Sequence, residues 1–406
     1  MTGPLEGTTV VDVSGYVAGP TCGAILASMG ADVVKVEPPA GDEFRRSGPF
    51  VKGTSYPYEM LNHNKRSILV DLKQSEGVEV VQRLAAGADV FLESWRPGTA
   101  SRLGLGYDEL SAANERLVYC SISGFGQTGP YRERGGVDII AQAMGGLMGL
   151  TGEPGRPPVK VSYPITDIGA SLWGVIGILA ALSARGSTGQ GQQVDVALLD
   201  SPVSWSFWEA AQYFGAGAVP GPIGSAHRNV VPYRAFLCAD ERYLVVGVAS
   251  QQLWQRLCEV LERQELLDDE RFATADLRRQ NREALEEALE GMFARTPREE
   301  WLGRLEAAGI PAGPVYRYDE VLADEHVRHR GLVSLVEHPV AGPMNLVDVP
   351  LFLSGTPKHP IRSAPLPGAD TEQILRAAGI DGAAIERLER SGAVRRQAAR
   401  PPGSAQ

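Results

Sequence analysis

The sequence predicts an α/β protein, with a mainly parallel sheet in a large domain and a smaller α+β domain. Strand-like and helix-like segments alternate through the first half of the chain, which is typical of βαβ units. The composition changes after Gly215, and strand-like runs return from about residue 333. The length of 406 residues suits two or three domains, at about 100–200 residues for each domain.

The first half of the chain supplies the predicted sheet. Short runs of β-branched and apolar residues indicate strands, because such side chains suit a pleated, buried surface. We expect strands at residues 9–13, 32–37, 68–72, 90–93, 117–123 and 193–199. We expect helices at residues 22–30, 75–86 and 167–185, the last one long, apolar and ended by Gly186.

The second half begins with a stretch rich in Gly and Pro, residues 215–233, which indicates a linker or an active-site loop. The patterns that follow predict a hairpin, a helix and a strongly charged helical stretch, and later two short helices. These elements are expected at residues 235–238 with 243–248, 251–263, 277–308, 371–378 and 383–389. The polar, Pro-containing tail at 395–406 is predicted to be disordered.

Charge and composition exclude several classes of protein. With 39 Lys and Arg against 49 Asp and Glu the net charge is −10, which argues against nucleic-acid binding. The four cysteines are scattered, as in a reduced intracellular protein. The N-terminus does not resemble a signal peptide, and the longest apolar run, Leu172–Leu182, is shorter than a membrane span. We therefore expect a cytoplasmic protein that does not bind membranes.

Two motifs that would indicate a bound cofactor or metal are rejected. Residues 124–129 (GFGQTG) match the dinucleotide fingerprint G-x-G-x-x-G, but the residues after them are poor helix formers. That fingerprint needs a helix to open on the glycine loop, so a simple turn is the better interpretation. His326 and His329 are three residues apart among charged neighbours, which indicates a solvated face, and we expect no metal site.

Asp167 is the most informative carboxylate. It stands directly before the long apolar helix, where Asp is a favoured N-cap, and the residues alone favour that structural role. The same position would also suit a nucleophile, because the helix dipole would keep the carboxylate ionised. The small residues Gly169, Ala170 and Ser171 would then let a substrate approach closely.

Several cations follow the predicted strands. Phosphate groups favour such positions at the ends of parallel strands, and Arg can bind them through two nitrogens. For each residue alone, a solvated surface charge is at least as good an interpretation. The cations are Lys65, Arg66, Lys73, Arg96 and Arg102.

Together these segments resemble the family III coenzyme A transferases of the CaiB/BaiF type, the group that contains formyl-CoA transferase and α-methylacyl-CoA racemase. The resemblance extends from Leu5 to about Val394. It rests on six motifs in the family order: VVDVSGYVAGPTCG with LASMGADVVKVEPPAGD, NKRSILVDLK, SGFGQTGPYRERGGVDIIAQAMGGLMGLTG, TDIGASLWGVIGILAAL, TGQGQQVDVALLD, and SGTP with APLPGADTEQIL.

The resemblance implies a Rossmann-like large domain built from both ends of the chain, and two copies interlocked like the links of a chain. It places the large domain at 1–215 and 331–394, with the linker and small domain at 216–330. It also implies that Asp167 is the nucleophile, forming first a mixed anhydride and then an aspartyl-CoA thioester. Coenzyme A would be a substrate and not a permanently bound cofactor. The implied CoA contacts are Val17, Ala18, Val70, Leu72, Lys73, Ser94, Trp95, Arg96, Arg102, Arg134, Val137 and Asp138.

Departures from particular family members bear on the substrate. Gly15 and Val17 replace the His and Gln of formyl-CoA transferase, and residues 224–228 lack its run of four glycines. Val137 stands where the racemases carry His. We therefore expect CoA transfer to a small carboxylic acid, plausibly a dicarboxylic acid with Arg45, Arg46 and Arg228 as counter-charges. An acyl-CoA racemase and a non-catalytic CoA-binding relative stay open as alternatives.

Overall fold

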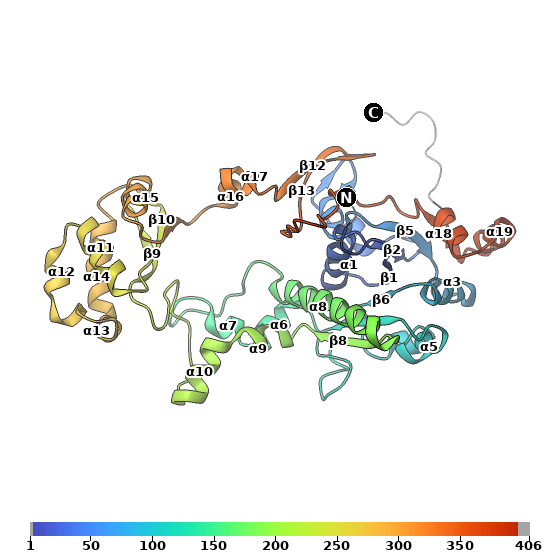
Figure 1. Ribbon diagram of the computed structural model, residues 1–406, viewed down its shortest axis with the longest axis horizontal. Coiled ribbons are helices and arrows are strands. Elements are labelled where there is room, and N and C mark those ends of the chain that lie inside the picture. The colour runs from blue at the N-terminus through green and yellow to red at the C-terminus, as the bar shows by residue number, and fades with distance from the viewer. Residues whose placement is uncertain (1–2, 397–406) are drawn as a thin grey trace. The chain divides into compact units, whose positions relative to one another are not determined.

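The computed structural model describes residues 3–396 and divides the chain into two compact units. Within the described residues, the large unit contains 3–147, 160–211 and 328–396. The small unit contains residues 148–159 and 212–327 (Figure 1). The sequence interpretation had placed segment 148–159 in the large domain, because nothing in its composition sets it apart from its neighbours.

A seven-stranded sheet forms the centre of the large unit, in the order β14-β5-β2-β1-β6-β7-β8. Neighbouring strands from β5 to β8 pair in parallel, and only β14 is antiparallel. The α/β class with a mostly parallel sheet is thus confirmed. The strands are β1 (Thr9–Asp12), β2 (Asp32–Glu37), β5 (Arg66–Val70), β6 (Val90–Glu93), β7 (Val118–Ser123), β8 (Gln193–Ala197) and β14 (Val394–Arg395).

Strand β14 corrects the prediction for the tail. Arg395 pairs with Leu69 of β5, although we expected disorder from residue 395 onward. The carbonyl of Arg395 also accepts a hydrogen bond from Thr371. Residues 397–406 lie outside the described part of the chain.

Helices cover both faces of the sheet, because alternate side chains of each strand point to opposite sides. Val10 joins the core cluster that contains residues of α1 (Ala18–Ser28) and α8 (Ile165–Thr188), while its neighbour Val11 joins a second cluster on the other face. That second cluster is completed by α3 (Ser75–Ala86), α5 (Tyr107–Ala113), α18 (Thr371–Ala377) and α19 (Gly382–Ser391).

Helix α8 is the longest helix of the described chain and differs from its prediction at both ends. It begins two residues before Asp167, and it continues through Gly186 to the left-handed cap Gly189. By length and composition it could cross a membrane, yet 44% of its most apolar window is buried. Its buried face, which includes Ala170, Ile178 and Ala181, packs on the sheet.

The small unit folds around its own core. Strands β9 (Tyr233–Leu237), β10 (Tyr243–Gly247) and β11 (Ala312–Pro314) form an antiparallel sheet. The charged stretch predicted as one helical region forms three helices. The helices of this unit are α11 (Gln251–Val260), α12 (Gln264–Asp268), η2 (Glu270–Phe272), α13 (Ala275–Gln280), α14 (Arg282–Phe293), α15 (Arg298–Ala307), α16 (Tyr318–Ala323) and, shared with the large unit, α17 (Glu325–His329).

Short elements complete the chain. A hairpin of β12 (Val333–His338) and β13 (Gly342–Val347) packs its own small core against Tyr56 and Met60. The others are η1 (Glu43–Arg46), β3 (Phe50–Val51), β4 (Thr54–Ser55), α2 (Tyr56–Asn62), α4 (Thr99–Arg102), α6 (Asp138–Met144), α7 (Leu147–Leu150), α9 (Asp200–Trp205) and α10 (Phe207–Ala216).

Candidate active site

A cavity of about 610 Å³ lies in the large unit at the carboxyl ends of its central strands. Open α/β sheets bind ligands at this edge. The residues just after β6 and β7, the start of α6 and the first turn of α8 line it. We call it the Asp167 cavity. It gathers these sequence-predicted site residues: Val17, Ala18, Ser94, Trp95, Arg96, Arg134, Val137, Asp138 and Asp167.

Asp167 is the third residue of α8, so the predicted N-cap role is wrong. The cap position belongs to Pro164, which makes no side-chain cap hydrogen bond. The prediction that the helix dipole keeps Asp167 ionised is also not met. Burial, with a smaller contribution from the nearby Asp138, raises the pKa of Asp167 to about 7. A carboxyl removed from water is harder to ionise, and it is a stronger nucleophile once it is ionised.

The first turn of α8 is held by Asp138, at the start of α6. One oxygen of Asp138 accepts hydrogen bonds from the Thr166 amide (2.9 Å) and the Thr166 hydroxyl (2.8 Å). Its other oxygen accepts a bond from the amide of Gln142, at 2.7 Å. Because both of its carboxylate oxygens accept hydrogen bonds, Asp138 fixes the backbone next to Asp167.

The small residues after Asp167 have a packing role instead of the predicted role in substrate approach. A Cβ on Gly169 would lie 2.3 Å from the ring of Trp205, so only glycine fits against α9. Ala170 and Ser171 are fully buried. The Ser171 hydroxyl lies 2.7 Å from the carbonyl oxygens of both Ala18 and Asp167, which joins α8 to the start of α1.

A buried charge network supports the loop between β1 and α1, which forms one wall of the cavity. Asp12 accepts hydrogen bonds from the amide and hydroxyl of Ser14, and Lys65 donates to Asp12 at 2.8 Å. Lys35 donates to the Ser14 carbonyl. Both ammonium groups are almost completely buried. Lys65 is therefore a structural cation, and its predicted role in phosphate binding is wrong.

The cations of the cavity come from three segments. Arg96 follows β6, Arg132 and Arg134 lie in the turn before α6, and Lys160 precedes α8. Of these four, only Arg132 forms an ion pair with a described carboxylate, the exposed Glu133 at 3.4 Å. A Cβ at Gly135 would lie 3.2 Å from a terminal nitrogen of Arg96, so this glycine makes room for the guanidinium. The cavity thus offers positive charge together with the carboxyl of Asp167.

Four predicted CoA contacts do not line this cavity. Val70 is buried in the core, and Leu72 packs against the same core cluster as Trp95 does. Lys73 is exposed, and Arg102 donates to the Thr99 hydroxyl. Sequence reasoning missed Tyr16, Arg132 and Lys160 among the lining residues. Lys160 carried one signal, because it is the last cation before Asp167 in the loop that leads to this residue.

None of the three proposed counter-charges for a dicarboxylic acid lines the Asp167 cavity. Arg45 forms a two-nitrogen ion pair with Glu37 and stacks on Tyr58, so it is already neutralised. Arg46 donates to the carbonyl of Ala40. Arg228 belongs to a second cavity. Arg45 is thus a structural residue, in contrast to its predicted role.

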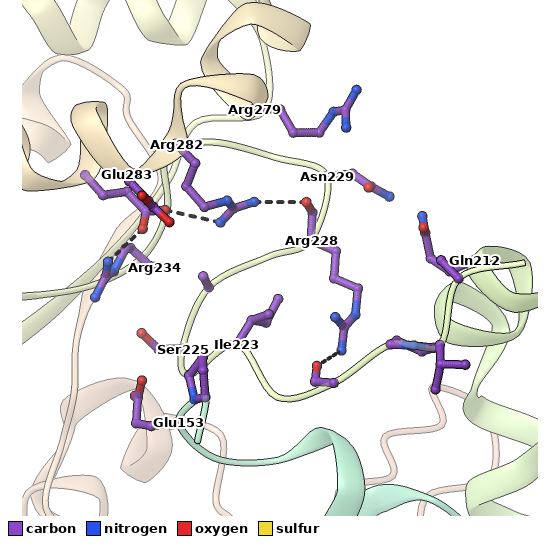
Figure 2. Close-up of a pocket in the computed structure, with 18 residues that line it drawn as sticks. Glu153, Gln212, Ile223, Ser225, Arg228, Asn229, Arg234, Arg279, Arg282 and Glu283 are labelled. Carbon is purple, nitrogen blue, oxygen red and sulfur yellow. Dashed lines mark hydrogen bonds and ion pairs between the residues drawn. The ribbon is translucent and has the colours of Figure 1, made fainter. Parts of the chain in front are cut away.

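The second cavity, of about 620 Å³, lies wholly within the small unit and is rich in arginine (Figure 2). Arg234 pairs with Glu286 at 2.7 Å and with Glu290 at 3.2 Å. Arg282 also pairs with Glu286, and it donates to the carbonyls of His227 and Arg228. Figure 2 shows Arg282 reaching the backbone of that loop. We call this second cavity the arginine cavity.

The sequence matches CoA-transferase family III over residues 5–371. The chain belongs to this family. The family assignment made from the motifs is thereby confirmed, and the enzyme is a CoA-transferase.

The matches between this CoA-transferase and its named relatives extend over nearly the whole length of both chains. It is 39% identical to the succinyl-CoA:glutarate CoA-transferase of Mus musculus, over 96% of this chain and 90% of the relative. It is 36% identical to the succinate–glutarate CoA-transferase of Agrobacterium fabrum, over 96% and 97%. The succinyl-CoA:mesaconate CoA-transferase of Haloarcula hispanica is 36% identical, over 95% and 99%.

The fold agrees with this assignment. A crystal structure of a CAIB/BAIF family protein from Brucella suis matches with a TM-score of 0.83 and 37% identity, over 93% of this chain and all of that one. The names of the relatives support CoA transfer between an acyl-CoA and a carboxylic acid as the activity of this enzyme.

Proposed function

We propose that this enzyme transfers CoA from a dicarboxylic acyl-CoA, such as succinyl-CoA, to a second dicarboxylic acid through covalent intermediates on Asp167. The observation that carries the proposal is the half-buried Asp167 carboxyl with its raised pKa, in a cavity that also contains cations. The names of two relatives support dicarboxylic substrates, because they specify succinyl-CoA with glutarate or with mesaconate.

In the first half-reaction a carboxylate oxygen of Asp167 attacks the thioester carbonyl of the donor. The carbon–sulfur bond breaks, CoA leaves as a thiolate, and a mixed anhydride joins Asp167 to the donor acyl group. The thiolate then attacks the side-chain carbonyl of Asp167. This releases the donor acid as a carboxylate and leaves an aspartyl-CoA thioester.

In the second half-reaction the carboxylate of the acceptor acid attacks the aspartyl thioester and again releases the thiolate. The thiolate attacks the acceptor carbonyl of the new anhydride, which gives the product acyl-CoA and restores the Asp167 carboxylate. No proton is gained or lost over the cycle. Water must be kept from both anhydrides, and the burial around Asp167 serves this purpose.

The pantetheine and phosphates of CoA are proposed to pass Ser94, Trp95 and Arg96 and to reach Arg134. CoA is longer than the Asp167 cavity, so its adenine would continue outward over Leu72 and Trp95, which pack on one core cluster. Lys73 and Arg102 are exposed there and would hold the distal phosphates. Val137 and Asp138 complete the wall at the reacting end.

The enzyme is proposed to act as an interlocked homodimer, as the family resemblance implies. The outward side of α8 exposes Leu172, Trp173 and Ile176, and the following helices expose Val203 and Phe207. Exposed apolar clusters of this kind mark interaction surfaces. Interlocked chains cannot separate without unfolding, so sedimentation of the diluted native protein should show no monomer. A reversible folded monomer would contradict this proposal.

Trapping the intermediate tests the mechanism. The enzyme is incubated with succinyl-CoA and hydroxylamine, and its peptides are examined by mass spectrometry. Hydroxylamine attacks an anhydride or thioester carbonyl, so a hydroxamate on Asp167 is expected. Exchange of the α-proton of an acyl-CoA with solvent deuterium, without an acceptor acid and without an Asp167 adduct, would favour a racemase instead. Val137 is 57% exposed at the position of the racemase His.

A further inference from the structure

Lys160 is a cation of the Asp167 cavity that the proposed covalent steps do not use. Its ammonium makes only long contacts, to the carbonyl oxygens of Val161 (3.4 Å) and Ser162 (3.3 Å). It forms no ion pair with any carboxylate in the described part of the chain. A lysine ammonium has three donors, so Lys160 keeps bonding capacity for a ligand in the cavity.

The backbone of Lys160 is tied to the same framework as Asp167. Gln142, which is fully buried, accepts a hydrogen bond from the amide of Val161 at 2.9 Å. The side-chain amide of Gln142 donates to Asp138 at 2.7 Å and to the Val161 carbonyl at 3.2 Å. Because Asp138 also holds Thr166, the hydrogen-bonded pair of Asp138 and Gln142 positions both the segment that carries Lys160 and the helical turn that carries Asp167.

A dicarboxylic substrate poses an electrostatic problem in this cavity. One of its carboxyl groups reacts, and the other enters as a negative charge that loses water. The cavity already contains Asp138 with both oxygens engaged, which repels a further anion. A buried charge of this kind is unfavourable unless a cation with donors meets it. Arg96 and Arg134 stand beside Trp95 and Gly135, where the proposed CoA track passes.

We propose that Lys160 binds the non-reacting carboxylate of the dicarboxylic substrate and so selects dicarboxylic over monocarboxylic acids. This inference rests on the proposed function, since it concerns the acid that receives CoA at Asp167. Lys160 is a specificity-determining residue, and the covalent steps at Asp167 proceed without it.

The test compares glutarate with valerate, which has the same chain length and lacks the second carboxylate. Succinyl-CoA is the donor for both acceptors. In the two-step mechanism the donor acid leaves before the acceptor reacts, so the kcat/KM of each acceptor reports on that acceptor alone. The variants are Lys160→Met, Lys160→Arg and the control Arg156→Met, which removes an exposed charge from the same loop outside the cavity lining.

In Lys160→Met the kcat/KM for glutarate should fall about tenfold or more, the size of one lost charge-assisted hydrogen bond. The kcat/KM for valerate should stay within about twofold of the wild-type value, because valerate has no second carboxylate to lose a contact and such substitutions have small effects. Lys160→Arg should recover most of the glutarate activity, and Arg156→Met should match the wild type. An unchanged glutarate value overturns the inference. An equal loss for both acids, or weaker CoA binding, also overturns it, because either would place Lys160 at Asp167 or at the phosphates.

A binding measurement separates failure of this inference from failure of the proposed function. Calorimetric titration of the free enzyme with glutarate needs no turnover. If the wild type binds glutarate and Lys160→Met does not, the carboxylate site stands even where no transfer is found. If glutarate binds both proteins equally, the inference fails even though transfer to glutarate continues.

Discussion

The two cavities of this enzyme have nearly the same volume, about 610 and 620 Å³, and differ in what their charges do. In the arginine cavity Arg234 and Arg282 already bind Glu286, and Arg282 also fastens a loop through its carbonyls. In the Asp167 cavity Arg96, Arg134 and Lys160 form no ion pair with a described carboxylate. Charges that pair with each other stabilise a fold, whereas cations that form no ion pair within the fold can bind an anionic ligand. The volume alone does not distinguish these two roles.

The largest expected difference between the cavities follows from removal of a carboxyl. Asp167→Asn should lower kcat for CoA transfer at least about a thousandfold, because the nucleophile is lost while the side-chain shape is kept. Glu283→Gln, in the lining of the arginine cavity, should retain wild-type activity. Succinyl-CoA and glutarate serve as substrates. Comparable losses of kcat in both variants would contradict the assignment of the chemistry to the Asp167 cavity alone.

The structural role of the buried charge network next to the Asp167 cavity can be tested by measuring the free energy of unfolding. Lys35 and Lys65 outweigh the effect of burial and lower the pKa of Asp12 to about 2. Lys65→Met leaves that carboxylate buried without its main partner, so the free energy of unfolding should fall by about 3–5 kcal/mol. Arg234→Met removes a cation that is 28% exposed and should cost less. Urea unfolding followed by circular dichroism measures both, and equal losses would contradict the ranking.

Binding of CoA should distinguish Arg96 and Arg134, which form no ion pair with a described carboxylate, from the arginines of the arginine cavity. Replacing Arg96 and Arg134 together by Gln should weaken CoA binding about tenfold to a hundredfold, and the loss should shrink as salt is raised. Arg279→Gln in the arginine cavity is the matched control and should have no effect.

Replacing Lys73 and Arg102 by Ala maps how far the CoA track extends. Weaker binding of CoA would support the proposed contacts at its adenine end. An unchanged affinity for CoA would mean that the contacts do not extend beyond Trp95. Fluorescence titration with CoA at two salt concentrations measures these variants as well as those of the Asp167 cavity.

The smallest expected effect is a shift of the pH profile. Transfer needs ionised Asp167, whose pKa is about 7, so the rate should rise with pH through that range in the free enzyme. Asp138→Asn removes a neighbouring negative charge, which lowers the pKa of Asp167 and moves the rise to lower pH. Burial is the larger cause of the raised pKa, so the shift should be under about one pH unit.

The control for the pH profile is Asp195→Asn. Asp195 is not among the groups that shift the pKa of Asp167, and it accepts a hydrogen bond from the amide of Gln127. The profile of this variant should match the wild type. A profile that does not move in Asp138→Asn would leave burial as the whole cause of the raised pKa.

Local patterns predicted the elements better than they predicted the site. The strand at Asp32–Glu37 and the helix at Ser75–Ala86 have the predicted bounds, because the pleat and the helical turn each impose a short period on apolar residues. The glycines of residues 124–129 form a turn with no helix directly after it, as expected from the poor helix formers there. Gly186 failed as a helix end because packing of α8 on the sheet outweighs the low helix propensity of one glycine.

The sequence by itself determined the α/β class and the family, since these depend on residue types and on the order of motifs along the chain. Its resemblance to the family then implied that Asp167 is the candidate nucleophile, whereas the residues alone favoured a helix cap. Only the tertiary structure decided the roles of the charges. By sequence, Lys65 and Arg45 are candidates for ligand binding. In the fold Asp12 pairs with Lys65 and Glu37 pairs with Arg45, so both cations are neutralised. Lys160 became a candidate because the fold brings it into the cavity of Asp167, where it forms no ion pair with a described carboxylate. Whether a charge is paired depends on contacts across the fold, and no local pattern in a chain contains them.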